Sequence, residues 1–357
     1  MPPGRLPPRA ARYAPAPMSL CVVGSIAFDA VESPFGAREG MLGGSAVHFS
    51  LAASFFTDVR VVGPVGEDFG PDEYAVLAGR GVSTDDIERV EGGETFFWRG
   101  HYEYDLNTAH TDETQLNVFG EFAPKLSEES KAAENLFLAN IQPDLQREVR
   151  EQCAGARFAG LDSMNLWIDI ARDSLVQTIG GVDLVFLNDA EIRMLTDQPN
   201  LVRAARESLV KTIAGVDIVF MNDAELRMLT EEPNLVKAAR SVLGMGPTVV
   251  VAKQGEYGAA LFTGDSFFAL PAYPLETVND PTGAGDSFAG GFLGYLDSQE
   301  DSTDHGALRR AMTYGSTLAS FNVEDFGTER VARLTREEID ERFEEFRRMT
   351  SFEVIEA

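Results

Sequence analysis

The sequence predicts an α/β protein with a doubly wound, mainly parallel sheet and helices on both faces. Short apolar runs of strand type alternate with helix-like segments, and each run ends at or just before a polar or turn residue. A glycine-rich loop followed at once by an apolar helix-like run is typical of a ligand-binding turn in such folds. The 357 residues, 44% of them hydrophobic, are enough for one large domain with an insertion.

The expected strands of the main sheet are seven short apolar runs. They cover residues 20–26, 59–65, 137–140, 158–162, 184–187, 218–221 and 248–252. Because binding sites in such sheets lie at the carboxyl ends of the strands, the polar residues that follow the runs are functional candidates. These are Asp29, Asp162, Asn188, Asn222 and Lys253.

The segment 95–122 differs from its surroundings because it is rich in aromatic residues and partly alternating (TFFWRGHYEYDL, then TQLNVF). We expect it to form strands outside the main sheet, as a lid over the substrate. A pair of additional edge strands without a gating role is an equally valid interpretation.

An internal repeat interrupts the second half of the chain. Residues 174–207 and 208–241 align without gaps, and 25 of the 34 positions are identical. This predicts a tandem duplication of one helix–strand–helix unit, since two copies are too few for a solenoid. Because a packed parallel sheet resists an additional strand, we expect one copy to occupy the sheet and the other to be extruded, reshaped or packed against a partner subunit.

The composition excludes several kinds of partner. With 57 acidic and 30 basic residues the net charge is −27, which disfavours nucleic acids and anionic membranes. The acidity, with only five lysines, favours a halophilic cytoplasmic protein whose self-repulsion is screened by salt. Cys21 and Cys153 give no disulfide framework and suit a reducing cytoplasm.

The ends of the expected domain follow from composition. The first 17 residues are rich in Pro, Ala and Arg and are expected to be a disordered leader, so that Met18 is an alternative start. Residues 18–357 then form a single domain. No apolar run approaches the length needed to span a bilayer.

The loop from Asn279 to Phe288, N-D-P-T-G-A-G-D-S-F, carries the clearest chemical signal. Gly283 and Gly285 allow a tight turn that aims several N–H groups at one point, and a helix starting there adds the positive end of its dipole. Asp286 stands in the first turn of that helix. Beside a phosphoryl group, a carboxylate can accept the proton of an attacking hydroxyl.

This loop resembles the D-T-x-G-A-G-D signature of the ribokinase-like (PfkB) family of carbohydrate and nucleoside kinases, with Pro281 at its second position. The resemblance covers residues 18 to about 334, interrupted by the duplication. It implies a ribokinase-like fold with a small β-lid, ATP as phosphoryl donor, and Asp286 as catalytic base. It also implies that the N–H groups of Gly283, Ala284 and Gly285 stabilise the charge on the transferred group.

Other stretches match the family's substrate-binding motifs. Asp29, at the end of the first expected strand, matches an Asp that binds sugar hydroxyls. Gly43 and Gly44 resemble the start of the G-G-x-x-x-N signature, in which His48 here replaces Asn, and its role is left open. Arg99 in the lid is a further candidate contact. The absence of basic residues at positions 45 and 46 favours an unphosphorylated acceptor.

The resemblance also assigns nucleotide and metal ligands. Lys253-Gln-Gly-Glu-Tyr-Gly258 resembles the T-x-G-x-x-G turn of the nucleotide site. The candidate nucleotide contacts are Asp280, Thr282, Lys253, Gly255, Gly258 and Ser320. One of two N-x-x-E pairs, Asn188 with Glu191 or Asn222 with Glu225, is expected to organise Mg²⁺ through water, and the other to form a helix-capping box. An activating monovalent cation is left open.

The expected function is ATP-dependent phosphoryl transfer to a hydroxyl of a small unphosphorylated sugar or polyol. A nucleoside kinase of the same family is the close alternative, because lid aromatics could stack a base. These are Phe96, Phe97, Trp98, Tyr102 and Tyr104. An inactive nucleotide- or sugar-binding regulator is the alternative from another class, because the duplication interrupts the metal-organising strand. A homodimer through the lid is a further expectation.

Overall fold

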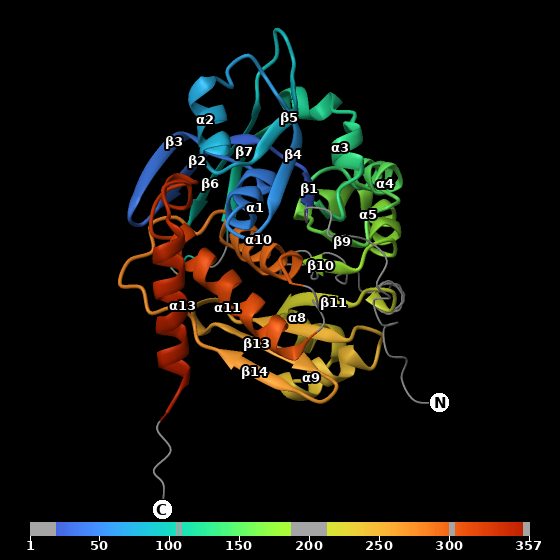
Figure 1. The fold of residues 1–357 in the computed structure, drawn as a ribbon, viewed down its shortest axis with the longest axis vertical. Coiled ribbons are helices and arrows are strands. Elements are labelled where there is room, and N and C mark those ends of the chain that lie inside the picture. The colour runs from blue at the N-terminus through green and yellow to red at the C-terminus, as the bar shows by residue number, and fades with distance from the viewer. Residues whose placement is uncertain (1–18, 105, 107–108, 187–212, 300–303, 353–357) are drawn as a thin grey trace, which may run out of the picture.

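The computed structural model describes residues 19–104, 106, 109–186, 213–299 and 304–352. Its main feature is a sheet of ten strands, which is parallel except at one end, where β12, β13 and β14 run antiparallel. Figure 1 shows this sheet crossing the molecule. Its spatial order is β14 (Phe267–Leu270), β13 (Ala259–Thr263), β12 (Val249–Lys253), β11 (Ile218–Asn222), β10 (Leu184–Phe186), β9 (Phe158–Leu161), β8 (Asn135–Leu138), β1 (Ser19–Val23), β4 (Asp58–Val65) and β5 (Ser83–Arg89).

Helices cover both faces of the sheet, as predicted for a doubly wound fold (Figure 1). One apolar core includes residues of α1, α10, α11 and α13, and the other includes residues of α4, α5, α8 and α9. The helices are α1 (Ser45–Ala53), α2 (Pro71–Gly79), α3 (Glu128–Lys131), α4 (Pro143–Gln152), α5 (Asn165–Ile179), α8 (Asp223–Thr230), α9 (Leu235–Leu243), α10 (Ala284–Asp297), α11 (His305–Asn322), α12 (Glu329–Ala332) and α13 (Arg336–Thr350), with 3-10 turns at η1 (Asn117–Glu121) and η2 (Gly255–Tyr257).

A second sheet lies outside the main one, in the order β3-β2-β6-β7. Its strands are β2 (Ala27–Ser33), β3 (Gly36–Gly43), β6 (Phe96–Tyr102) and β7 (Ala109–Gln115). The strands expected within 95–122 are therefore present. The expectation that Asp29 ends the first strand is wrong, because β1 stops at Val23 and Asp29 lies inside β2. The chain leaves the main sheet at Gly24, where a Cβ would lie 2.5 Å from the Cβ of Ala139.

Both repeated strands lie in the main sheet, so the expectation that one of them is extruded or reshaped is wrong. β10 and β11 are parallel neighbours, with Leu184 opposite Ile218 and Phe186 opposite Phe220. The Phe186 and Phe220 rings stack with centroids 4.2 Å apart. Because the two copies present equivalent side chains to the same faces, each strand fits beside the other, and the sheet is wider by one strand spacing, about 4.8 Å.

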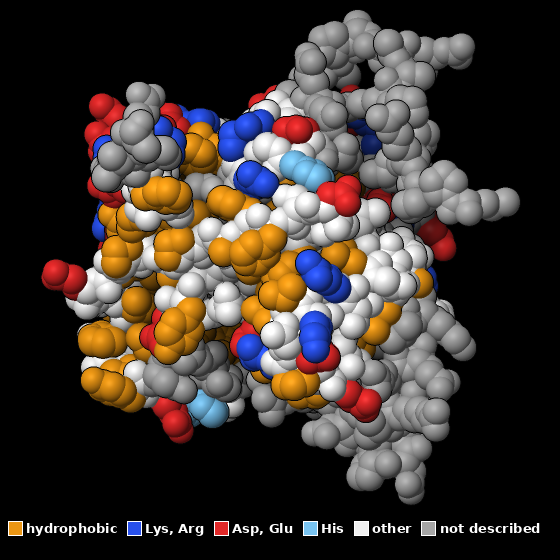
Figure 2. Space-filling view, turned by 90° about the horizontal axis from the view of Figure 1, so that it is seen from below, with side chains coloured by type: hydrophobic (Ala, Val, Ile, Leu, Met, Phe, Trp, Pro, Cys, Tyr) orange, Lys and Arg blue, Asp and Glu red, His pale blue; other side chains and the backbone are white. Residues whose placement is uncertain are grey.

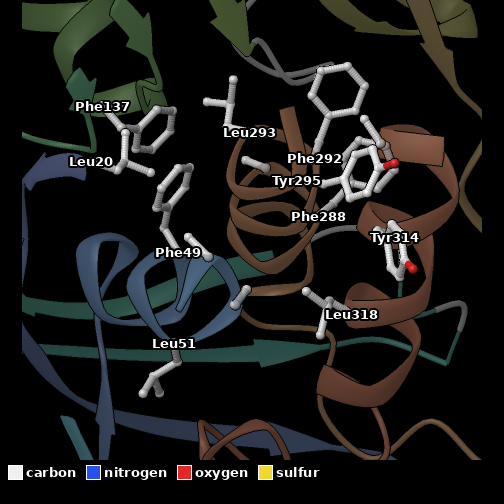
Figure 3. Close-up of a cluster of buried hydrophobic side chains, with 14 of the residues drawn as sticks. Leu20, Phe49, Leu51, Phe137, Phe288, Phe292, Leu293, Tyr295, Tyr314 and Leu318 are labelled. Atoms are coloured by element: carbon white, nitrogen blue, oxygen red, sulfur yellow. The ribbon is translucent and has the colours of Figure 1, made fainter. Parts of the chain in front are cut away.

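The two helices that lead to the candidate site, α1 and α10, pack closely against each other. Figure 3 shows Phe49 of α1 beside Phe137 and close to the apolar side chains of α10. A Cβ on Gly290 would lie 2.3 Å from the carbonyl oxygen of Phe49, and one on Gly294 would lie 2.9 Å from the Cα of Ala53. These glycines let the backbones approach, which fixes the starts of the two helices relative to each other.

The surface at the β14 end of the molecule is less acidic than the composition alone would indicate. Figure 2 views this face, and hydrophobic side chains occupy more of it than acidic ones. Among the described residues, the exposed large apolar side chains include those of Phe267 on β14, Met349 on α13 and Phe352 after it. Among the described helices, none combines the length and apolarity needed to cross a bilayer.

Candidate active site

The glycine-rich turn predicted from the sequence opens α10. Gly283 is the N-cap residue and has φ +74°, a left-handed conformation that favours glycine. A Cβ at this position would lie 2.3 Å from Nδ1 of His48, so space also requires glycine there. Asp286 stands in the first turn of the helix. The turn therefore places backbone N–H groups and a carboxylate at one helix N-terminus.

Hydrogen bonds from three other segments hold the loop before α10. Asp280 is fully buried, and its carboxylate accepts N–H bonds from Thr282 and from Gly327, both at 2.9 Å. The side chain of Asn322 donates to the carbonyl of Thr282 at 2.7 Å. The hydroxyls of Tyr102 and Thr282 are 3.1 Å apart, which links strand β6 to the loop. Asp280, predicted as a nucleotide contact, thus braces the loop in this structure.

His48 supports the start of α10 through Asn322. Nδ1 of His48 lies 3.0 Å from Oδ1 of Asn322, which also accepts a bond from the Ser287 hydroxyl at 3.0 Å. Because that oxygen accepts from both partners, Nδ1 of His48 carries the proton. Sequence reasoning left the role of His48 open and did not assign this role to Asn322. The sequence offers no signal for this pair, because His48 and Asn322 are 274 positions apart.

Among the candidate substrate-binding residues, Asp29 has a strongly raised pKa. Its side chain is 4% exposed, and burial, helped by the charges of Asp280 and Asp286, raises its pKa to about 7. A backbone bond from Gly44 opposes this shift. A Cβ on Gly43 would lie 1.9 Å from Oδ2 of Asp29. Glycine at this position therefore gives the carboxylate its space.

Asp286 belongs to a group of interacting charges from several elements. Burial raises its pKa, while His48, the Ser45 hydroxyl and the Lys253 ammonium lower it. Burial also raises the pKa of Asp162 well above its usual range, and the charge of Asp286 adds to this effect. Asp162 directly follows β9, and Lys253 ends β12. Two of the strand-end candidates, Asp162 and Lys253, therefore interact electrostatically with Asp286.

The remaining nucleotide candidates lie in two places. Gly255 and Gly258 bound the turn η2 after β12, and both have positive φ, 54° and 101°. A Cβ on Gly258 would lie 2.1 Å from the carbonyl oxygen of Leu270. The Ser320 hydroxyl donates to the carbonyl of Thr317 and accepts a bond from Arg342 at 3.1 Å, so it is engaged within the helical layer.

Arg99, the lid candidate for substrate binding, has acidic partners on its own sheet. Its guanidinium lies 2.7 Å from Glu39 on β3 and 3.7 Å from Glu113 on β7. The side chain is 39% exposed. In this structure Arg99 therefore links β3, β6 and β7 of the second sheet.

The second N-x-x-E pair forms a capping box. Oδ1 of Asn222 accepts the N–H of Glu225 at 2.9 Å, and the Glu225 carboxylate accepts the N–H of Asn222. Glu225 is fully buried. Asn188 and Glu191 lie outside the described residues. Within the described part of the chain, no group of three or more His, Cys, Asp or Glu side chains is arranged to hold a metal ion directly.

Comparison with known proteins indicates the class of enzyme. Residues 198–333 match the pfkB family carbohydrate kinases, a span that includes the second repeat, Lys253 and the loop with Asp286. A cytidine kinase of Thermococcus kodakarensis is 27% identical over 282 residues, which are 77% of this chain and 87% of that protein.

Solved structures share the fold. A Burkholderia thailandensis nucleoside kinase in complex with inosine has a TM-score of 0.64 at 19% identity, covering 91% of this chain and 98% of that one. An Arabidopsis thaliana ribokinase complexed with ribose and ATP has a TM-score of 0.61 at 19% identity, covering 92% and 99%. The fold is therefore that of the ribokinases. The match to the pfkB family carbohydrate kinases, over residues 198–333, agrees with this fold.

Proposed function

We propose that this enzyme transfers the γ-phosphoryl group of ATP to a hydroxyl of an unphosphorylated sugar or sugar-containing acceptor, with Asp286 as the base. The observation that carries the proposal is the position of Asp286. Its carboxylate stands in the first turn of α10, beside the N–H groups of the Gly283 turn. A carboxylate and an anion-binding turn at one helix start are two of the groups that catalyse phosphoryl transfer.

The chemistry assigns a role to each group. Asp286 takes the proton of the acceptor hydroxyl. The oxygen of that hydroxyl bonds to the γ-phosphorus, and the bond between the γ-phosphorus and the ADP oxygen breaks. The N–H groups of Gly283, Ala284 and Gly285 stabilise the charge on the transferred group. Lys253, whose charge acts on Asp286, would bind the leaving phosphates. Mg²⁺ bound with ATP would neutralise further phosphate charge.

The electrostatics of the acceptor side favour an unphosphorylated substrate. Asp29 interacts with the charges of Asp280 and Asp286, and Asp162 also interacts with Asp286. A phosphate on the acceptor would raise the pKa values of these carboxyl groups further, which would weaken its binding. Arg99 is the lid residue expected to offset this effect, and Glu39 and Glu113 already pair with it.

A nucleoside is the more specific candidate acceptor, because the cytidine kinase relative aligns over 77% of this chain. Among the lid aromatics considered for base stacking, Phe96 is buried with its ring 5.1 Å from that of Phe119. Tyr104 is 89% exposed. Phe97, Trp98 and Tyr102 therefore remain the candidates for contact with a base.

The test is release of ADP from Mg-ATP, measured at low and at molar KCl with ribose, fructose, adenosine, inosine and cytidine as separate acceptors. Turnover with one acceptor supports the kinase and separates sugar from nucleoside. Binding of ATP without turnover for any acceptor at either salt concentration would contradict the proposal and favour a nucleotide-binding regulator.

A further inference from the structure

The first turns of α1 and α10 meet at a hydrogen bond between two side chains. Ser45 is the first residue of α1, and its hydroxyl donates to Oδ1 of Asp286 at 2.5 Å. The close packing of these helices, seen at Phe49 in Figure 3, fixes the two residues relative to each other. The bond therefore joins two rigid elements rather than two mobile loops.

The Ser45 hydroxyl is oriented by its other contacts. The Ser45 N–H donates to the hydroxyl of Ser25 at 3.1 Å, which fixes the backbone. The N–H of Asn140, two residues after β8, approaches the Ser45 oxygen at 3.4 Å. The hydroxyl proton is then free to bond a carboxylate. Its partner is Oδ1 of Asp286, and the hydroxyl also acts on Asp162. The indole N–H of Trp167 holds the Asn140 side chain at 2.8 Å.

We propose that Ser45 is a positioning residue for the catalytic carboxylate. Its hydroxyl engages one oxygen of Asp286 and so presents the other oxygen to the acceptor hydroxyl. This inference rests on the proposed function, because it requires Asp286 to act as the base. A carboxylate held by one directed bond is limited in rotation, and alignment of this kind strongly affects the rate of an enzymatic step.

The same bond affects the protonation of Asp286. The groups that act on this carboxylate are His48 and Ser45 from α1, Lys253 from β12, Asp162 after β9, and Asp29 from β2. The Ser45 hydroxyl stabilises the charged carboxylate and lowers its pKa. Loss of the hydroxyl should raise the pKa of Asp286. On acidification, the variant should therefore lose activity at a higher pH than the wild type does.

The experiment compares Ser45→Ala, Ser45→Cys and Ser45→Thr with Ser50→Ala. Ser50 lies on the same helix, is fully buried, and its hydroxyl has no partner among the described residues. For each variant, kcat, the KM for Mg-ATP and the pH profile of kcat/KM are measured with the acceptor that the wild type uses. Thermal melting and ATP binding report folding.

We expect Ser45→Ala to lower kcat by about 10²-fold, to leave ATP binding intact, and to move the acidic limb of the profile to higher pH. Ser45→Cys, whose thiol is a weak donor, should shift the limb in the same direction by less. Ser45→Thr, which keeps the hydroxyl, should restore the wild-type limb. Ser50→Ala should match the wild type in kcat and in pH profile.

An unchanged kcat and pH profile in both Ser45→Ala and Ser45→Cys would overturn the inference. So would a loss of kcat with an unshifted acidic limb, since packing damage alone would produce it. Asp286→Asn in the same assay separates the two proposals. If it retains turnover, the proposed base is wrong, whereas an inactive Asp286→Asn beside a normal Ser45→Ala refutes only the positioning role.

Discussion

Asp29 should make the stability of this protein fall as the pH rises towards neutrality. Its pKa is about 7 in the folded chain, compared with 3.8 when the side chain is exposed. Between these values the folded protein holds a proton that the unfolded chain has released. The stabilisation is therefore complete below pH 4, is lost as the pH rises to about 7, and changes little above it.

The magnitude follows from the size of the pKa shift. A shift of this size corresponds to about 4 kcal/mol over the full range, and to roughly 2.5 kcal/mol between pH 5 and pH 8. Asp29→Asn removes the titrating group and keeps a side chain of nearly the same volume. The variant should lack this part of the pH dependence, although other carboxylates in the site still titrate.

The assay is urea unfolding of the wild type and Asp29→Asn at pH 5 and pH 8, at one fixed salt concentration. We expect the wild type to lose about 2.5 kcal/mol more unfolding free energy than the variant between the two pH values. The wild-type KM for the acceptor should also fall as the pH rises through 7, because the charged carboxylate accepts hydroxyl bonds better. Equal pH dependence of stability in both proteins would refute the reasoning.

Two further predictions concern the helix start and the repeat. Gly283→Ala should destabilise the fold by about 1–3 kcal/mol, because it combines a positive φ with a clash against His48. Gly285→Ala, where a Cβ would have nothing within 4 Å, should leave thermal stability unchanged, and equal loss in both would contradict the steric argument. Deletion of residues 174–207 should give a protein that still folds cooperatively and binds ATP, because β11 can pair with β9 as β10 does. Aggregation of the deletion variant in calorimetry and gel filtration would show that both strands are needed.

Local patterns predicted much of this fold. The apolar runs 59–65 and 218–221 match β4 and β11 to within a residue at either end, because short buried strands leave a clear apolar signal. The turn at Gly283 was predictable because its conformation depends on residues close in sequence. The hairpin of β2 and β3 was missed, because β3 is largely exposed and carries charged residues that give no apolar signal.

The errors come from contacts between distant segments. Whether both repeated strands join the main sheet depends on whether Phe186 and Phe220 can stack within it. The sequence alone does not predict that packing. The brace formed by Asp280 and Gly327 joins residues on either side of α10 and α11. The contact of Ser45 with Asp286 spans 241 positions. The contact between Ser45 and Asp286 follows from the crossing of α1 and α10, which no local pattern encodes.

One comparison would decide whether Asp286 is the base of a phosphoryl transfer. ADP release and phosphorylated product are measured for the wild type and Asp286→Asn, with Mg-ATP and the preferred acceptor, beside direct measurement of ATP binding. We expect the variant to lose about 10²–10⁴-fold in turnover while it binds ATP as the wild type does. Turnover near the wild-type rate in Asp286→Asn would contradict the assignment of this carboxylate as the catalytic base.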